Sequence, residues 1–331
     1  MSTAPVPPGV EHAISTRGLT KRFGRQTVVN GIDLAVPRGS VFGFLGPNGS
    51  GKTTTIRMLL GLAGASAGEI EVLGRRMPTQ LSSVLPEVGA LIEGPGFYPF
   101  LSGTANLRRL DAADGFALAS TRRARVDSAL DRVGLSHAAG KKVRAYSLGM
   151  KQRLGIANAL LAPRALIVLD EPTNGLDPQG TREVRSLIRS LADGGTTVFV
   201  SSHLLSEIEQ MCAHVAVMSA GRLVAQGPLD ELRSVGRARV RLLVAGTDAA
   251  PAARVLERFA PAAGQAMTSV APGSTGGDAE LVGELADDVV SERIVAELVA
   301  EGVGVRGFAV ERPSLEELFV ELTGEGFDVA Q

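Results

Sequence analysis

Short continuous apolar runs alternate with helically spaced apolar residues along two stretches of the chain, 39–62 and 165–225. A continuous apolar run of strand length is typical of a strand that is buried on both faces. Strands that alternate with helices usually pair in parallel. The predicted strands and helices of this kind lie at 39–45, 54–62, 166–170, 181–191 and 197–203. The alternation predicts an α/β core.

The segments beside this core have other patterns. Apolar positions in residues 14–36 predict an antiparallel β region. Residues 94–162 are predicted to be mostly helical, with helices at 104–116, 120–133 and 148–161. Residues 1–13, which begin with a polar, proline-rich stretch, are expected to form a disordered tail.

The pattern changes again near Gly227, and a smaller second domain is predicted over residues 226–331. Its strands are predicted at 237–244, 267–270, 280–282 and 305–310, and its helices at 228–233, 252–259, 289–300 and 314–322. The β-α-β-β-α-β order within it suggests a small ferredoxin-like α+β module. Because it carries no catalytic constellation, we expect the module to stabilise a dimer, with ligand sensing as the alternative.

One loop of the predicted core carries a phosphate-binding pattern. Residues 46–53 read Gly-Pro-Asn-Gly-Ser-Gly-Lys-Thr, which has the form GxxxxGK[ST] between a strand and a helix. Its glycines allow backbone N–H groups to turn inward, and the helix N-terminus adds its dipole to the anion site. We expect Lys52 to contact the β- and γ-phosphates and Thr53 to offer its hydroxyl to Mg²⁺. The candidate nucleotide-binding residues here are Gly46, Asn48, Gly49, Ser50, Gly51, Lys52, Thr53 and Thr54.

Two carboxylates stand at the end of the predicted strand at 166–170, where Asp170 is followed by Glu171. Ligands of open α/β sheets bind at the carboxyl ends of strands, where we expect the Asp170 carboxylate to be exposed. Asp170 is predicted to hold Mg²⁺ through a water, and Glu171 to polarise the attacking water as the base. The alternative is a solvated acidic pair, which is less favoured in a chain that also has a phosphate loop.

A second anion site is predicted at the start of the helix at 148–161. Residues 146–153 read Tyr-Ser-Leu-Gly-Met-Lys-Gln-Arg, and Ser147 stands at a natural N-cap position. Together with Gly149, it exposes backbone N–H groups at a helix start. One nucleotide cannot easily use both anion sites of one protomer. The sequence therefore favours a dimer in which each nucleotide contacts the loop of one subunit and this helix start of the other.

The apolar strand predicted at 197–203 ends in a histidine, His203. A lone histidine at a strand end usually has a structural role. This strand, however, is separated from the strand at 166–170 by one predicted helix, so the neighbouring sheet edge would deliver the imidazole to the same site. There it can donate to a γ-phosphate and respond to its presence.

These motifs, in this order, resemble those of the ATP-binding subunits of ABC transporters over about residues 14–225. In the resemblance, residues 46–53 are the Walker A loop, residues 146–150 the signature motif and residues 166–171 Walker B. The resemblance implies a P-loop NTPase cassette of the α/β class, with an antiparallel β subdomain and a helical subdomain at about 94–162. The expected division of the chain is a tail at 1–13, the cassette at 14–225 and the accessory domain at 226–331.

The resemblance also assigns roles that the residue pattern does not show by itself. It implies that Phe23 stacks on adenine, that Asp177 belongs to the D-loop of the nucleotide site, and that His203 is the switch histidine. In the signature motif the family usually has Leu-Ser-Gly-Gly-Gln, and this chain keeps the serine and the second glycine. Leu148 is tolerable there only if its φ is negative and its side chain points away from the phosphate.

A second departure is Glu93, which occupies the position of a glutamine that contacts Mg²⁺ and the attacking water in the family. A carboxylate about 4 Å from a phosphate oxygen would be repelled by about 4 kcal/mol at an effective dielectric constant near 20. We therefore expect Glu93 to act through Mg²⁺ or to face the partner subunit.

Composition narrows the classes of function. The net charge of −1 at pH 7 provides no global basic field that would recruit nucleic acid. No apolar run approaches the roughly 18 residues of a membrane-spanning helix, and no signal-peptide pattern opens the chain. The single cysteine, Cys212, cannot form an internal disulfide. We expect no nucleic-acid partner and no membrane span.

The resemblance implies an ATP-hydrolysing motor that uses ATP and Mg²⁺. Two copies would close around two Mg-ATP and drive a separate polytopic permease from the cytoplasmic face of the membrane, where the chain would be peripheral. The stretch Ile-Glu-Gly-Pro-Gly-Phe-Tyr-Pro at 92–99 resembles exporters of the bacitracin and lantibiotic type. The ending at 313–319 resembles drug-exporter ATPases, including those of daunorubicin resistance, so the expected cargo is an antibiotic or drug-like compound.

Two other functions stay open. One is a soluble ABC ATPase that acts on ribosomes or DNA. The single cassette and the short interval between the Walker motifs disfavour it, because such relatives carry two cassettes or a long coiled-coil insertion. The other is a protein that sequesters a drug through residues 226–331 without turnover.

Overall fold

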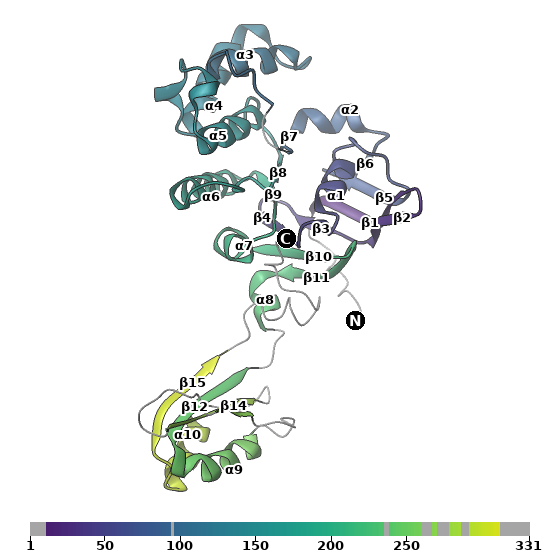
Figure 1. Cartoon of the computed structure of the whole chain (residues 1–331). Helices are drawn as coiled ribbons and strands as arrows, with labels where there is room; N and C mark the ends of the chain where they lie inside the picture. The colour runs from purple at the N-terminus through teal and green to yellow at the C-terminus, as the bar shows by residue number, and fades with distance from the viewer. Residues whose placement is uncertain are drawn as a thin grey trace. The chain divides into compact units, whose positions relative to one another are not determined.

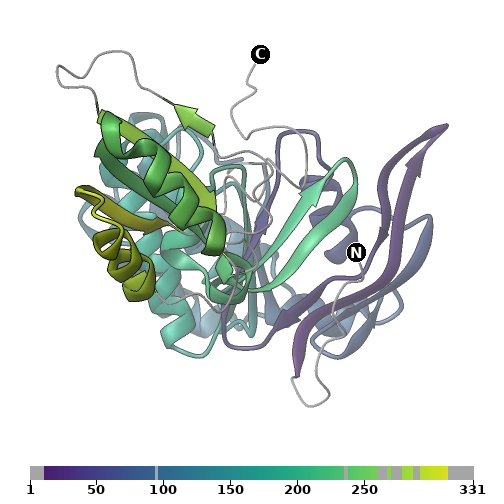
Figure 2. The same ribbon diagram turned by 90° about the horizontal axis from the view of Figure 1, so that it is seen from below.

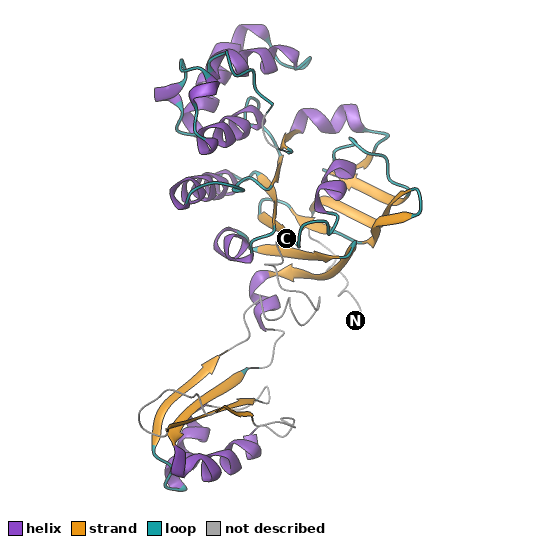
Figure 3. Cartoon of the chain, in the orientation of Figure 1, coloured by secondary structure: helices purple, strands orange, loops and turns teal. Residues whose placement is uncertain are grey.

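A computed structural model of the chain describes residues 11–93, 96–234, 238–259, 267–269, 278–285 and 291–311. The chain divides into two compact units, a first unit that includes residues up to Leu229 and a second unit from Asp230 to Gly326. Figures 1 and 3 show the helices and strands of both units. Within the described ranges, no helix has the length and hydrophobicity that crossing a bilayer requires.

The first unit is built around a six-stranded, mostly parallel sheet. Its strands are β4 Val41–Leu45, β7 Val88–Leu91, β8 Leu166–Asp170, β9 Thr197–Ser202, β10 His214–Ser219 and β11 Arg222–Pro228. They lie in the order β11-β10-β4-β9-β8-β7, and only the pair of β10 and β11 is antiparallel. Every residue of β4, β8 and β9 is buried, as their continuous apolar runs predict. The predicted α/β fold is confirmed.

A second sheet of this unit is antiparallel. Its strands are β1 His12–Phe23, β2 Gln26–Ile32, β3 Ala35–Pro37, β5 Ala67–Val72 and β6 Arg75–Met77. The order is β2-β1-β5-β6, and β3 also pairs with β1. The tail predicted at 1–13 is too long, because β1 begins at His12. Ala13 is fully buried and its carbonyl accepts a hydrogen bond from the Leu73 N–H, so tertiary contacts order this end of the strand.

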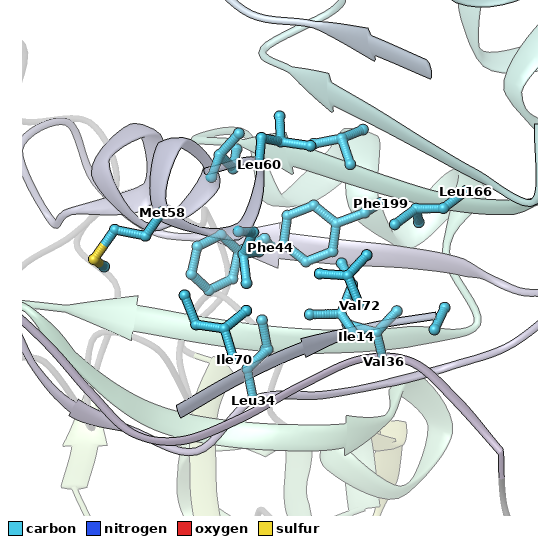
Figure 4. Close-up of a cluster of buried hydrophobic side chains, with 14 of the residues drawn as sticks. Ile14, Leu34, Val36, Phe44, Met58, Leu60, Ile70, Val72, Leu166 and Phe199 are labelled. Atoms are coloured by element: carbon cyan, nitrogen blue, oxygen red, sulfur yellow. The ribbon is translucent and has the colours of Figure 1, made fainter. Parts of the chain in front are cut away.

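The two sheets share an apolar core, which Figure 4 shows in close-up. The Phe199 ring of β9 lies between Phe42 and Phe44 of β4, with centroid distances of 5.7 and 5.4 Å. Side chains of the antiparallel sheet and of its connections pack in the same cluster, among them Ile14, Leu34, Val36, Ile70 and Val72. Because β4 runs straight into the phosphate loop, this packing fixes the base of that loop.

The α-helices of the first unit have bounds that differ slightly from the predicted ones. They are α1 Lys52–Leu59, α2 Leu81–Val84, α3 Gly103–Ala113, α4 Arg122–Arg132, α5 Leu148–Ala159, α6 Pro178–Asp193 and α7 Leu205–Met211. Helix α8, Leu229–Ser234, begins at Leu229, the residue after which the second unit starts. The helix predicted at 104–116 ends earlier because Asp114 has an extended ψ of 105° and its N–H bonds the Asp111 carbonyl. Helices α3, α4 and α5 form a group of their own, here called the helical subdomain (Figure 1).

Short 3₁₀ helices connect several of these elements. They are η1 Leu85–Glu87, η2 Ala119–Thr121, η3 Ser136–Ala138, η4 Val143–Ala145 and, in the second unit, η5 Gly246–Asp248.

The second unit contains a four-stranded antiparallel sheet. Its elements are β12 Arg239–Ala245, α9 Ala249–Phe259, β13 Met267–Ser269, β14 Asp278–Glu284, α10 Ser291–Ala300 and β15 Val305–Glu311. The strand order is β13-β14-β12-β15. Helix α9 joins β12 and β13, and β14 lies between these two strands. Helix α10 joins β14 and β15, and β12 lies between them. Figure 2 shows both helices on one face of this sheet. The final helix predicted at 314–322 lies outside the described residues.

Candidate functional site

The loop between β4 and α1 requires glycine at specific points. A Cβ at Gly46 would lie 2.3 Å from the Met218 carbonyl oxygen, which is far inside van der Waals contact. Gly51, the N-cap of α1, has a φ of 107°, and Gly49 has a φ of 81°. L-residues rarely adopt such angles. Of the other candidates here, Asn48 is exposed on the loop and Thr54 is half-buried in the first turn of α1.

Lys52 is the first residue of α1 and is only 5% exposed. Its Nζ donates to the Gly46 carbonyl at 2.6 Å and lies 3.4 Å from Oε1 of Glu171. Burial lowers the pKa of the Lys52 ammonium from its ordinary value, and the charge of Glu171 opposes this shift. Ser50 Oγ is buried and makes no hydrogen bond within the described residues. A buried cation and an unpartnered hydroxyl in one loop suit an anionic ligand with several oxygens.

Asp170 is more enclosed than we expected. It stands at the end of β8 as predicted, but it is 5% exposed. Thr53 Oγ1 donates to its Oδ2 at 3.0 Å, and Ser201 Oγ donates to its Oδ1 at 2.5 Å. These hydroxyls satisfy the buried carboxylate, which would otherwise be costly. A carboxylate and a hydroxyl in contact are the oxygen donors that Mg²⁺ prefers, so the residues present fit that ion.

Glu171 and His203 are brought together by the parallel pairing of β8 and β9. His203 Nδ1 lies 2.7 Å from Oε2 of Glu171, and the Glu171 N–H donates to Ser201 Oγ at 2.9 Å. Glu171 has a φ of 48°, which is uncommon for a residue with a side chain. Such strain costs about 1–3 kcal/mol and persists only where surrounding contacts hold it. The Glu171 carboxylate lies between the His203 imidazole and the Lys52 ammonium.

Glu93 is not part of this cluster. Its carboxylate is 57% exposed and forms an ion pair with Arg57 of α1. The residue has a φ of 55°, the same unusual region as Glu171. The sequence predicted that the Glu93 carboxylate would be repelled by a phosphate. In the structure Arg57 neutralises that negative charge. The structure therefore brings Thr53 and Asp170 together, but it does not bring Glu93 to them.

The helix start at Ser147 lines an open pocket of about 460 Å³. Ser147 Oγ caps α5 by accepting a hydrogen bond from the Met150 N–H at 3.2 Å. The sequence requires a negative φ at Leu148, and Leu148 is not among the residues with positive φ. Its side chain is 52% exposed. The pocket is lined by Ser147, Leu148, Gly149, Arg153, Gly175, Leu176, Asp177, Gln179, Gly180 and Glu183. No residue of the phosphate loop lines it.

Phe23 stands at the end of β1 with 55% of its surface exposed. The Lys21 ammonium lies 4.9 Å from the centroid of its ring. An exposed ring that already stacks with a cation provides a flat face for another planar group.

Sequence reasoning missed Ser201, which is fully buried. Its hydroxyl donates to Asp170 and accepts from the N–H of Glu171, so one side chain holds both carboxylate residues. The available signal was a pair of serines at the end of an apolar strand, immediately before His203.

Comparisons with known proteins agree on one family. Residues 29–174 match the family described as "ABC transporter". The bacitracin transport ATP-binding protein BcrA of Bacillus licheniformis is 45% identical over 225 residues, which cover 68% of this chain and 72% of that protein. The daunorubicin/doxorubicin resistance ATP-binding protein DrrA of Streptomyces peucetius is 35% identical over 318 residues, covering 96% and 94%. The structure of cbiO1 from Clostridium perfringens, part of the ABC transporter complex cbiONQ, matches with a TM-score of 0.61 and 27% identity, covering 68% of this chain and 91% of that one.

Proposed function

This chain belongs to the ATP-hydrolysing, ATP-binding subunits of ABC transporters, and from that membership we propose that two copies close around two Mg-ATP to drive a separate membrane permease. The chain would act from the cytoplasmic face of the membrane, as a peripheral subunit. The relatives named for bacitracin transport and daunorubicin resistance support export of an antibiotic or drug-like compound. In this proposal the cassette runs from β1, which begins at His12, to the end of β11 at Pro228, and the second unit is an accessory domain that stabilises the dimer.

One observation carries the dimer proposal. The helix start at Ser147 faces a pocket whose lining includes Gly149 and Asp177 but no residue of the loop at 46–53. Both the loop and the helix start present backbone N–H groups that favour an anion. A triphosphate held by one protomer's loop can use the second site only if that site comes from another copy. Each bound ATP then contacts both subunits and favours the closed state by the difference in contacts.

We assign the nucleotide contacts as follows. Phe23 stacks on adenine, and the loop residues from Gly46 to Thr54 surround the phosphates. Lys52 exchanges its bond with the Gly46 carbonyl for the β- and γ-phosphates. Thr53 and Asp170 would hold Mg²⁺. Glu93, which is exposed and paired with Arg57, would face the partner subunit. Bound there, Mg²⁺ would neutralise the charge of the phosphate oxygens.

In hydrolysis, Glu171 accepts a proton from the water that attacks the γ-phosphorus, and the bond between the β- and γ-phosphates breaks to give ADP and phosphate. In this proposal the contact of 2.7 Å to His203 orients the Glu171 carboxylate, and the imidazole would donate to the γ-phosphate. Loss of the phosphate removes contacts that held the two subunits together, so the dimer reopens.

The shared site is tested by mixing two inactive variants, Ser147→Arg and Lys52→Ala. Each homodimer should lack hydrolysis, because both of its sites are defective. A mixed dimer retains one intact site, so random pairing in an equimolar mixture should restore up to about a quarter of the parental turnover. The measurement is steady-state phosphate release from the two proteins, alone and mixed.

Leu62→Arg is the matched control for the arginine insertion, because Leu62 is 66% exposed and lies outside both anion sites. It should retain parental turnover. No restored activity in the mixture, or restoration to the full parental rate, would contradict a site shared between subunits.

The permease contact is proposed at residues 96–101, here called the hinge, which lead into the helical subdomain. A hollow of about 500 Å³ lies there, lined by Phe97, Tyr98, Arg109 and other residues of 96–113. The Arg109 guanidinium lies 4.8 Å from the centroid of the Tyr98 ring, and Tyr98 is 57% exposed. An apolar hollow with an exposed aromatic edge suits a short amphipathic segment of a partner protein. The hinge lies in the chain between β7 of the main sheet and α3 of the helical subdomain. A partner held there would therefore follow a movement of the helical subdomain.

A photo-crosslinking experiment tests this contact. Benzoylphenylalanine in place of Tyr98, which lines the hollow and is 57% exposed, should crosslink to a polytopic membrane protein in membranes of the organism that encodes the chain. Phe116 is the matched control, since it is 72% exposed but lies outside the hollow. Equal crosslinking from both positions, or crosslinks to soluble proteins only, would argue against the hinge as the docking surface.

A further inference from the structure

Glu207 of α7 is a buried carboxylate to which the proposed mechanism gives no role. It is 6% exposed. Its Oε2 accepts one hydrogen bond from Thr173 Oγ1 at 2.5 Å and another from Ser202 Oγ at 3.2 Å. Among the described residues, no cationic side chain forms an ion pair with it. Burying a carboxylate without a counter-ion is unfavourable, so the two hydroxyl donors are what makes this placement tolerable.

The two donors stand next to the two groups that act in hydrolysis. Thr173 is two residues after Glu171, and Ser202 immediately precedes His203. Both are buried, at 5% and 1% exposure. One oxygen of Glu207 therefore joins the loop that follows β8 to the end of β9, just beyond the point where their ladder of backbone hydrogen bonds stops.

This link answers a specific need of the Glu171 backbone. Glu171 has a positive φ, and a side-chain-bearing residue keeps that conformation only if the contacts on both sides of it hold it there. On the N-terminal side, the Glu171 N–H donates to Ser201 Oγ. On the C-terminal side, Thr173 is tied to Glu207. The second tie, to Ser202, carries the restraint to the residue next to His203.

We propose that Glu207 is a positioning residue for ATP hydrolysis. Through Thr173 and Ser202 it holds the Glu171 carboxylate and the His203 imidazole in the relative positions that hydrolysis requires. The inference rests on the proposed roles of Glu171 and His203. In this proposal Glu207 acts only through Thr173 and Ser202, and not on the nucleotide or the attacking water. Glutamine also offers one oxygen that accepts two bonds, but it lacks the negative charge that makes hydrogen bonds to a carboxylate roughly twice as strong, so it weakens both links.

The first test replaces Glu207 with Gln, which keeps the shape of the side chain. We expect kcat to fall about 10- to 100-fold, because small misplacements of reacting groups have effects of that size. The affinity for ATP should stay within about two-fold, since the phosphate loop makes no contact with Glu207. Glu209→Gln, the same change on the same helix, is the control and should retain the parental kcat. Thermal unfolding of each variant checks that the fold is kept.

Two single-link variants guard against a failure of Glu207→Gln to fold. Thr173→Val and Ser202→Ala each remove one donor and leave the other. Each should lower kcat, and their effects should be less than additive with that of Glu207→Gln, because all three act through one oxygen. In a Glu171→Gln background, Glu207→Gln should cause no further loss of the residual rate. A residue with only a structural role would lower that rate as well.

The outcomes separate this inference from the proposed function. If Glu171→Gln keeps parental turnover, the assignment of the base is wrong. If Glu171→Gln abolishes turnover while Glu207→Gln, Thr173→Val and Ser202→Ala keep parental kcat, only the positioning role of Glu207 is overturned. A fall in ATP affinity that accounts for the whole effect would overturn it too.

Discussion

Replacement of Glu171 with Gln is expected to lower ATP turnover by at least about 100-fold, because a general base contributes between about 10² and 10⁴ in rate. The amide keeps the size of the side chain but cannot accept a proton from water. ATP affinity should stay within about two-fold or rise, since the variant retains Lys52 and Thr53. Closed dimers with bound ATP should accumulate, because hydrolysis is the step that reopens them. The measurements are phosphate release, nucleotide titration and size-exclusion chromatography in ATP and Mg²⁺.

Glu69→Gln is the control for this change. Glu69 lies on β5 with an exposed side chain and contacts none of the candidate site residues in the structure. It should turn over ATP like the parent. Turnover near the parental rate in Glu171→Gln would mean that another group takes the proton, and the roles given to Glu171 and His203 would have to be withdrawn.

Gly46→Ala is expected to abolish tight ATP binding, with the affinity falling at least about 10-fold, and to lower the free energy of unfolding by about 1–3 kcal/mol. The added methyl would lie 2.3 Å from the Met218 carbonyl and 2.8 Å from Ser50 Oγ. The first of these neighbours is backbone of β10 and cannot move without disturbing the sheet. The loop must shift instead, and its N–H groups then no longer converge on one ligand. Denaturant unfolding and titration with a fluorescent ATP analogue measure the two effects.

Gly64→Ala is the matched control. Like Gly46, Gly64 is not among the glycines with positive φ, but a Cβ there meets no atom within 4 Å. The change in unfolding free energy should be within about 0.5 kcal/mol, as for surface substitutions in general. Similar losses in both variants would show that the space around Gly46 is not what excludes a side chain.

The elements that the sequence predicted best are those made by neighbouring residues. The run 41–45, the glycine loop and α1 follow one another in the chain, so their pattern carries their structure. The strand at 166–170 and the strand ending before His203 were also predicted, because continuous apolar runs indicate buried parallel strands. Their shared sheet edge follows from parallel pairing, and the structure confirms that Glu171 and His203 meet there.

The errors arose where distant contacts decide. Asp170 was expected to be exposed, yet the hydroxyls of Thr53 and Ser201 enclose it. The tail predicted at 1–13 loses its last two residues to β1, because Ala13 is buried by the packing of the sheets. Local composition is a poor guide at such places, since burial is set by elements far away in the chain.

By itself, the sequence determined the phosphate loop, the acidic strand end and the capped helix start at Ser147, because each is built by adjacent residues whose conformations and hydrogen bonds are local. Only the tertiary structure decided which partner each polar group has. Arg57 neutralises Glu93 from 36 residues away, and Glu207 reaches Thr173 from 34 residues away. Such pairs form when packed strands and helices bring distant side chains within hydrogen-bond distance, and no spacing along the chain indicates them.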